Sequence, residues 1–171
     1  MIIYGLDPDV HRIAFVSMRD EKITQVKTIP RANKIGRIHP EYIHTMKRLF
    51  YVASHCGAFV LMEGIFLNVG KKGQAIPQTN IDAFRRLAEV QGEVKIFAAS
   101  YQVPIDVVQP STWQCEVFGT YDKNKELSTT LAKVVAKDFG ELSDHESDAL
   151  CIAIYGTKVE KQKQEKMKMH G

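Results

Sequence analysis

The sequence predicts an α/β domain whose mixed sheet has three antiparallel strands followed by two parallel strands, with helices on both faces. Three observations predict it. The chain opens with three β-rich segments, apolar runs then alternate with amphipathic helical segments, and 171 residues suffice for one domain with a substantial core. Apolar residues make up 44% and charged residues 25%, which is typical of a globular protein.

The opening segments are residues 1–7, 12–18 and 22–29. A polar turn at residues 19–21 separates the last two, which indicates a hairpin. Short connections of this kind join antiparallel neighbours. We therefore expect an antiparallel meander at the start of the chain.

A helix is predicted from Pro40 to the residue before Gly57. Proline suits the first turn of a helix, and glycine commonly follows the last. Between them, apolar residues recur at helical spacing: Ile43, Met46, Phe50 and Ala53. The continuous apolar run at residues 58–62 then predicts a short strand buried on both faces.

The second half continues the alternation. Residues 68–79 are polar and contain Gly and Pro, which predicts a loop, and Asn80 is a candidate cap for a helix over residues 80–101. A short strand is predicted at residues 105–108 and a helix at about residues 125–139.

Ser143 and Glu146 form a capping-box pattern that opens a last helix, which continues to about Tyr155. We assign one domain to residues 1–156 and a basic tail to residues 157–171. The tail either extends the last helix or is irregular, and we expect it to be a solvated end.

This order of elements, βββ-α-β-α-β-α-α, matches the ribonuclease H-like fold. In that fold the ends of the first and fourth strands are adjacent, and the last helix packs against them. Side chains from these three elements are therefore expected to meet.

The net charge of +3 comes entirely from the tail, where five lysines outnumber two glutamates. The body sums to zero, so its overall charge gives no argument for nucleic-acid binding. Local basic clusters must carry that argument instead.

We expect a cytoplasmic protein without a membrane span. No apolar stretch reaches the roughly 18 to 20 residues that a membrane helix needs, and acidic residues follow the first strand where a signal peptide would stay apolar. Cys56, Cys115 and Cys151 are odd in number and far apart, which disfavours disulfides and zinc and predicts reduced core thiols.

Three carboxylates lie at the edges of predicted core elements. Asp7 ends the first strand, Glu63 follows the buried run, and Asp148 lies in the last helix. Acids converging on one site repel one another unless a cation joins them, and oxygen ligands favour Mg²⁺ or Mn²⁺ over zinc. Taken alone, Asp7 could be a turn residue and Glu63 a solvated strand end.

Helical spacing leaves two partners for Asp148. Asp144 is four residues before it and His145 is three before it, so both pairs can share a helix face. Asp144 also suits the helix N-terminus, and His145 could lie on the surface. The spacing alone does not decide between them.

The chain resembles the RuvC-type Holliday junction resolvases. Its matching segments run in family order: Ile-Ile-Tyr-Gly-Leu-Asp7-Pro8, Glu63 with Phe66, Asn80-Ile81-Asp82-Ala83, Gln91-Gly92, and His145-Glu146-Ser147-Asp148-Ala149-Leu150. The resemblance implies a metal-dependent endodeoxyribonuclease that resolves four-way junctions by paired symmetric nicks, leaving a 5′ phosphate and a 3′ hydroxyl.

By that resemblance, Asp7, Glu63, His145 and Asp148 are the catalytic residues and metal ligands, with Asp144 as a second-rank ligand. Two Mg²⁺ ions per site are implied, and Mn²⁺ could replace them. His145 would act as a ligand or in proton transfer.

The resemblance also implies DNA contacts and a homodimer. Phe66 would stack on unpaired bases, although a core position is the alternative. The helix over residues 80–101 would form the dimer interface. Basic candidates for DNA-backbone contacts are Lys71, Lys72, Lys123 and Lys125, and further Arg31, Lys34 and Arg37.

Three departures from the family pattern leave sequence preference and strict four-way specificity open, and one of them is a longer loop after Phe66. Asp9 replaces a glycine, as a turn residue or an extra charge near the metals, and Trp113 replaces a lysine and is expected in the core. Alternative functions are a nuclease for flaps or RNA hybrids and a noncatalytic protein that binds branched DNA. A sugar-kinase-like or actin-like ATPase is disfavoured because Asp7 is not followed by a glycine-bearing phosphate loop.

Overall fold

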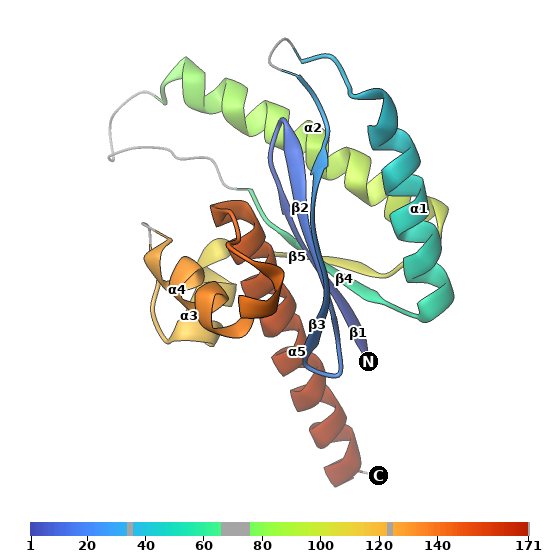
Figure 1. The fold of residues 1–171 in the computed structure, drawn as a ribbon, viewed down its shortest axis with the longest axis vertical. Coiled ribbons are helices and arrows are strands. Elements are labelled where there is room, and N and C mark those ends of the chain that lie inside the picture. Colours follow the sequence, from blue (N-terminus) through green and yellow to red (C-terminus); the bar gives the residue numbers. More distant parts are fainter. Residues whose placement is uncertain (34–35, 66–75, 123–124, 171) are drawn as a thin grey trace.

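The computed structural model describes residues 1–33, 36–65, 76–122 and 125–170. Its sheet has the strand order β3-β2-β1-β4-β5, with β1–β2 and β2–β3 antiparallel and β1–β4 and β4–β5 parallel (Figure 1). The strands are β1 (Ile2–Pro8), β2 (Arg12–Arg19), β3 (Lys22–Pro30), β4 (Phe59–Glu63) and β5 (Ile105–Val108). The predicted mixed sheet is confirmed.

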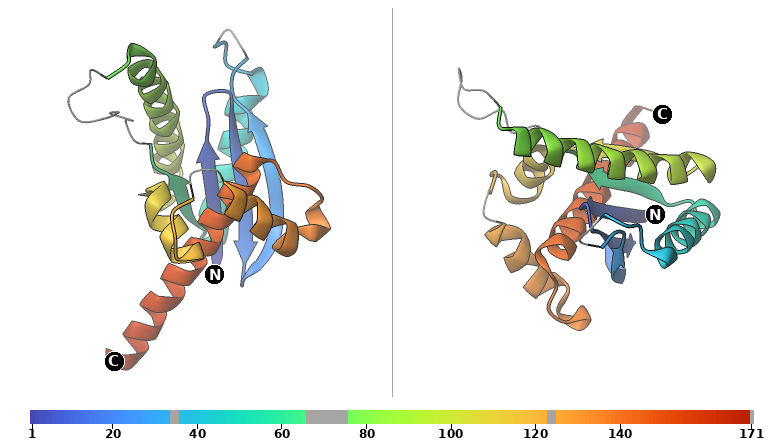
Figure 2. Two further views of the ribbon diagram at one scale, coloured as in Figure 1. Left: turned by 90° about the vertical axis from the view of Figure 1, so that its left-hand side faces the viewer. Right: turned by 90° about the horizontal axis from the view of Figure 1, so that it is seen from above.

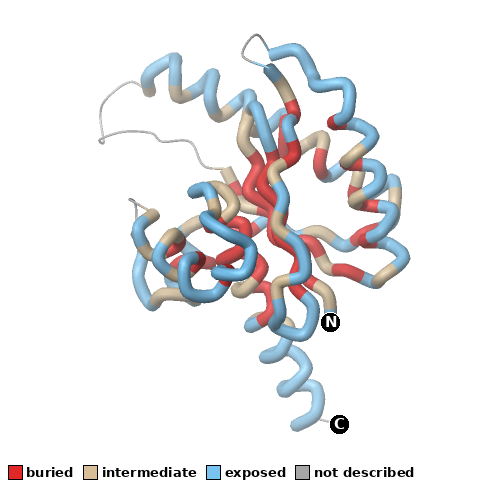
Figure 3. The backbone as a smooth tube through the Cα atoms, viewed as in Figure 1, coloured by how far each residue is buried: buried red, intermediate tan, exposed pale blue. Residues whose placement is uncertain are grey.

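Two helical layers enclose this sheet. The helices are α1 (Pro40–Cys56), α2 (Gln78–Ser100), α3 (Pro110–Phe118), α4 (Glu126–Val135), a short 3₁₀ turn (Lys137–Phe139) and α5 (Asp144–His170). Helices α1 and α2 cover one face, and α3, α4 and α5 cover the other (Figure 2). The buried backbone segments concentrate along the sheet and the inner sides of these helices (Figure 3).

The alternation of side chains along β1 separates the two cores. Tyr4 and Leu6 pack on the α1–α2 side, whereas Ile3 belongs to the cluster around α5. Gly5 lies directly beneath α5: a Cβ atom there would come 2.1 Å from the Ala149 carbonyl oxygen. This close approach fixes the height of α5 over β1, and therefore of the first turns of α5 over the strand end.

Sequence signals placed the ends of α1 correctly. Pro40 lies in its first turn, and Gly57 ends it with a positive φ of 63°. The capping box of α5 is also confirmed, because the Ser143 backbone N–H donates to Glu146 Oε2 at 3.0 Å and the Glu146 N–H donates to Ser143 Oγ at 3.3 Å.

Several boundaries differ from prediction. Helix α2 begins at Gln78, so Pro77 rather than Asn80 precedes it, and the helix predicted over residues 125–139 breaks at Ala136 into α4 and the 3₁₀ turn. Helix α3 was not predicted. It had signals at both ends, since Pro110 lies in its first turn and Gly119 follows it with a positive φ.

Helix α5 continues through the tail to His170 and projects from the body (Figure 1). The assigned boundary after residue 156 therefore falls inside a helix. Exposed side chains line this extension, and Lys161 bonds Glu21 at 2.5 Å. The predicted solvated end takes helical form.

Two further expectations concern the cysteines, which were predicted as reduced core thiols, and the lack of a membrane span. All three cysteines are free, but only Cys151 is buried; Cys115 is exposed, so its predicted core position is wrong. Cys115 lies on the outer side of α3, and its exposure could not be predicted because that helix was not predicted. None of the described helices is long and apolar enough to cross a bilayer.

Candidate acidic active site

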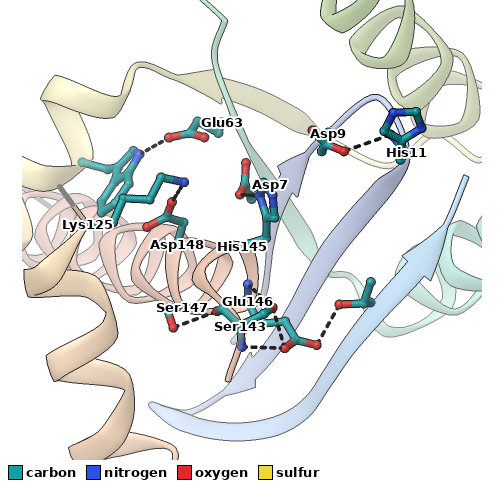
Figure 4. Close-up of polar contacts among 12 residues, drawn as sticks. Asp7, Asp9, His11, Glu63, Lys125, Ser143, His145, Glu146, Ser147 and Asp148 are labelled. Atoms are coloured by element: carbon teal, nitrogen blue, oxygen red, sulfur yellow. Dashed lines mark hydrogen bonds and ion pairs between the residues drawn. The ribbon is translucent and has the colours of Figure 1, made fainter. Parts of the chain in front are cut away.

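Two strand ends and one helix bring together the acids singled out in the sequence (Figure 4). Strand β1 is parallel to β4 with Leu6 opposite Met62, so Asp7 and Glu63 are the next residues on adjacent strands. Both follow the alternation that points toward α5. The first two turns of α5 add His145 and Asp148 to this edge.

His145 faces Asp7. Its Nδ1 lies 2.6 Å from Asp7 Oδ2, and the Asp7 side chain is almost fully buried. The hydrogen bond to Asp7 raises the pKa of His145, with the partial burial of the ring opposing the change. The His145 side chain is 31% exposed, so its ring reaches the surface while Asp7 orients it.

Asp148 pairs with Lys125, whose Nζ lies 2.5 Å from Asp148 Oδ2. The other oxygen, Asp148 Oδ1, is buried and has no hydrogen-bond partner among the described residues. The nearby Ser128 hydroxyl donates to the Lys125 carbonyl oxygen at 3.0 Å, and its hydrogen bonding also lowers the pKa of Asp148. Burial raises the pKa of Asp148 and the bond from Lys125 opposes this, so the carboxylate is only partly compensated.

Glu63 is held from two sides. Trp113 Nε1 donates to its Oε1 at 3.2 Å, and Gln91 Nε2 donates to its carbonyl oxygen at 2.6 Å. Burial, then the charge of Asp7 and hydrogen bonding with it, raise the pKa of Glu63 to about 9. Without a further cation, Glu63 is therefore neutral at pH 7.

Helix α5 is fastened at the end that enters the site. Glu146 accepts hydrogen bonds from the Ser143 hydroxyl and the Thr28 hydroxyl of β3, both at 2.8 Å. These bonds tie the first turn of α5 to the opposite edge of the sheet. They fix the rotation of the helix, and so which of its side chains point at Asp7.

That rotation separates the two partners proposed for Asp148. His145 points at Asp7, whereas Asp144 is exposed in the first turn of α5. Asp9 serves the turn after β1, because its Oδ1 accepts from the His11 N–H at 2.9 Å.

A cavity of about 410 Å³ opens beside these groups. Glu63, Lys125 and Asp148 lie along its wall with Pro8 and Gly64. Among the described residues, no three His, Cys, Asp or Glu side chains already form a metal cage. The donor chemistry nevertheless suits a hard divalent cation, because carboxylate oxygens dominate and one buried oxygen lacks a partner.

The structure treats the predicted DNA contacts differently, and among them Arg37 is exposed. Phe66, Lys71, Lys72, Lys123 and Lys34 lie outside the described residues. Lys125 reaches the acidic cluster itself. Arg31 is buried and bonds Glu93, so its predicted exposure to DNA is wrong.

Two supporting contacts were missed from the sequence. The expected core position of Trp113 is confirmed, but its bond to Glu63 was not predicted. The hydrogen bond of Gln91 to Glu63 was also missed, although a polar side chain on the buried stripe of α2 was an available signal.

Neither a protein-family model nor a curated protein sequence matches the chain. Solved structures do match it. The Thermus thermophilus RuvC structure aligns with 91% of this chain and 92% of its own, at 17% identity and a TM-score of 0.65. The same protein in complex with Holliday junction substrate aligns with 95% and 96%, at 15% identity and a TM-score of 0.69.

The chain has the fold of RuvC. Because the alignment extends over nearly the whole length of both chains, the similarity covers the sheet and both helical layers. It confirms the ribonuclease H-like architecture that the order of elements predicted.

Proposed function

We propose that the chain is a metal-dependent endodeoxyribonuclease that cuts branched DNA, with four-way junctions as its main substrate. The observation that carries the proposal is the convergence of Asp7, Glu63 and Asp148, where one buried oxygen of Asp148 has no partner among the described residues and the pKa of Glu63 is raised by burial and by Asp7. A fully structural cluster of acids would be neutralised by its own neighbours. T. thermophilus RuvC, which shares the fold, was solved with a Holliday junction substrate.

Asp7, Glu63 and Asp148 are the residues that would hold Mg²⁺, with His145 at the rim. A pair of Mg²⁺ ions, or Mn²⁺ in their place, supplies activation of the attacking water and stabilisation of the leaving 3′ oxygen. Lys125 Nζ lies 2.5 Å from Asp148 Oδ2. Its side chain is 39% exposed, so it can leave this carboxylate and turn toward a DNA phosphate.

His145 is suited to holding a proton at the rim of the site. Asp7 binds Nδ1, which leaves Nε2 as the nitrogen that exchanges a proton with substrate or water. The raised pKa keeps a larger fraction of the ring protonated near neutral pH. A cationic ring beside the scissile phosphate would also favour its binding.

We further propose a homodimer through residues 80–101, which would present two sites to symmetric strands. Exposed apolar side chains on the outer face of α2 support this, namely Ile81 and Ile96. The other DNA contacts that we propose from the sequence are Phe66, Lys71, Lys72 and Lys123.

The test is cleavage of a synthetic four-way junction, a linear duplex and a 5′ flap in Mg²⁺. We expect wild type to place paired nicks in the junction, and Asp7→Asn to bind the junction without cutting it. Asp144→Asn is the matched control, because it neutralises an exposed carboxylate next to His145 and should cut normally.

Each contrary outcome removes a defined part of the proposal. Binding without cleavage by wild type in both Mg²⁺ and Mn²⁺ would leave a noncatalytic junction-binding protein. Faster cutting of the flap would keep the chemistry and replace the substrate. Loss of cutting in Asp144→Asn alone would exchange the roles of Asp144 and His145.

A further inference from the structure

Trp113 has one polar atom, and that atom is bonded to the acidic site. The indole is fully buried in the core between α3 and α5 and packs against Phe118, with ring centroids 6.3 Å apart. Its Nε1–H donates to Glu63 Oε1 at 3.2 Å. Trp113 is the single tryptophan of the chain.

This donor differs in kind from the other groups that bind the acids. Lys125 and His145 carry titratable nitrogens on partly exposed side chains, so an incoming cation can displace them. An indole N–H only donates hydrogen bonds and does not ionise near neutral pH. The ring of Trp113 is fully buried, so it has no room to rotate away from Glu63. Its bond to Glu63 therefore persists when the site is loaded.

A persistent bond to Oε1 restricts the Glu63 carboxylate to one orientation. The Gln91 amide, which donates to the Glu63 carbonyl at 2.6 Å, fixes the backbone of the same residue. With the backbone and one lone pair of Oε1 held, the carboxylate keeps a fixed orientation in which its other lone pairs are left for a cation. Groups that orient ligands in this way contribute to metal affinity without touching the metal.

We propose that Trp113 is a positioning residue, whose N–H presents Glu63 to a divalent cation and whose fluorescence therefore reports that the cation has bound. The inference rests on the cation site of the proposed function. It adds a residue from a part of the chain, α3, that contributes no acid to the site.

The first test uses Trp113→Phe, which keeps an aromatic ring in the core and removes the N–H. Calorimetric titration with Mg²⁺, without DNA, should show affinity lower than wild type by roughly 10- to 100-fold, the usual cost of losing a supporting contact. Phe118→Leu is the matched control: it alters packing against the same indole but keeps the N–H, and should bind Mg²⁺ as wild type does.

The second test needs no change in the core. Titrating wild type with Mg²⁺ should give a saturable change in tryptophan emission at the concentrations where calorimetry shows binding. Asp7→Asn, with its tryptophan intact, should show no such change. This measurement decides the inference even if Trp113→Phe fails to fold.

The outcomes separate this inference from the function on which it rests. If wild type binds no Mg²⁺ and cuts no DNA, both are overturned. If wild type binds and cuts, but Trp113→Phe binds equally well or the emission ignores Mg²⁺, only the role of Trp113 is overturned.

Discussion

The protein buries charge on both faces of its sheet, and the two clusters differ in how completely they are compensated. On the α1–α2 face, Arg31 makes two bonds to Glu93, at 2.8 and 2.6 Å, and a third to the Val10 carbonyl at 2.8 Å. The Tyr42 hydroxyl also donates to Glu93, at 3.2 Å. The guanidinium and both carboxylate oxygens are satisfied.

On the α5 face, three acids share one lysine and one histidine. One oxygen of Asp148 is left without a partner among the described residues, and burial, followed by the charge of Asp7, raises the pKa of Glu63. A buried charge whose hydrogen bonds are all made by neighbouring groups is typical of a structural cluster. A buried charge that its neighbours leave without partners is typical of a site that binds a ligand or an ion. We therefore interpret the Arg31–Glu93 cluster as structural and keep the acidic cluster as the proposed functional site.

The largest effect expected from this contrast is on activity. Asp148→Asn should reduce junction cleavage by more than about 100-fold, the upper end of what losing a mere supporting contact costs. Its unfolding free energy should change by less than about 1 kcal/mol, because Lys125 is partly exposed and returns to water. Cleavage assays and urea unfolding measure the two. A variant that cuts normally but unfolds easily would make Asp148 structural.

The second expected effect is on stability. Replacing a carboxylate by an amide on the α1–α2 face should destabilise the protein and leave cleavage unchanged. Glu93→Gln should lower the unfolding free energy by about 2 kcal/mol, less than the loss from breaking a fully buried pair because Glu93 is 34% exposed. Below its melting temperature it should cut junctions as wild type does. Urea unfolding beside Asp148→Asn tests this, and equal stability of the two variants would remove the distinction between the clusters.

A third expected effect is on pH dependence. Burial and the charge of Asp7 raise the pKa of Glu63 from an ordinary 4.5 to about 9, so a cation that binds Glu63 must displace its proton. Mg²⁺ affinity should therefore rise with pH between about 6 and 9, by at most tenfold per unit. Calorimetry in buffers of different ionisation enthalpy counts the proton released. Affinity independent of pH would show that Glu63 is already ionised.

The sign for stability is opposite. A carboxyl whose pKa is raised on folding favours the folded state at low pH, and that contribution is lost as pH rises from about 4.5 to about 9. Metal-free wild type should thus become less stable over this range. Glu63→Gln should flatten the dependence, since the amide does not titrate.

Most of the fold could be predicted from hydrophobic periodicity and turn chemistry. Alternating and continuous apolar runs placed the strands, and the ends of α1 and the start of α5 followed from local hydrogen-bonding rules. Helix α3 was missed because its nine residues are too few for an amphipathic pattern to be recognised in the sequence. The end groups Pro110 and Gly119 were its better signal.

By itself, the sequence determined the order of the strands and of helices α1, α2, α4 and α5, and which acids lie at strand ends. Those features depend on neighbours along the chain. Three matters were decided only by tertiary structure: that His145 rather than Asp144 meets Asp7, that Arg31 is buried, and that Trp113 bonds Glu63. Each depends on how one element is rotated or seated against another, as α5 is over Gly5, and no periodicity within a single element contains that information.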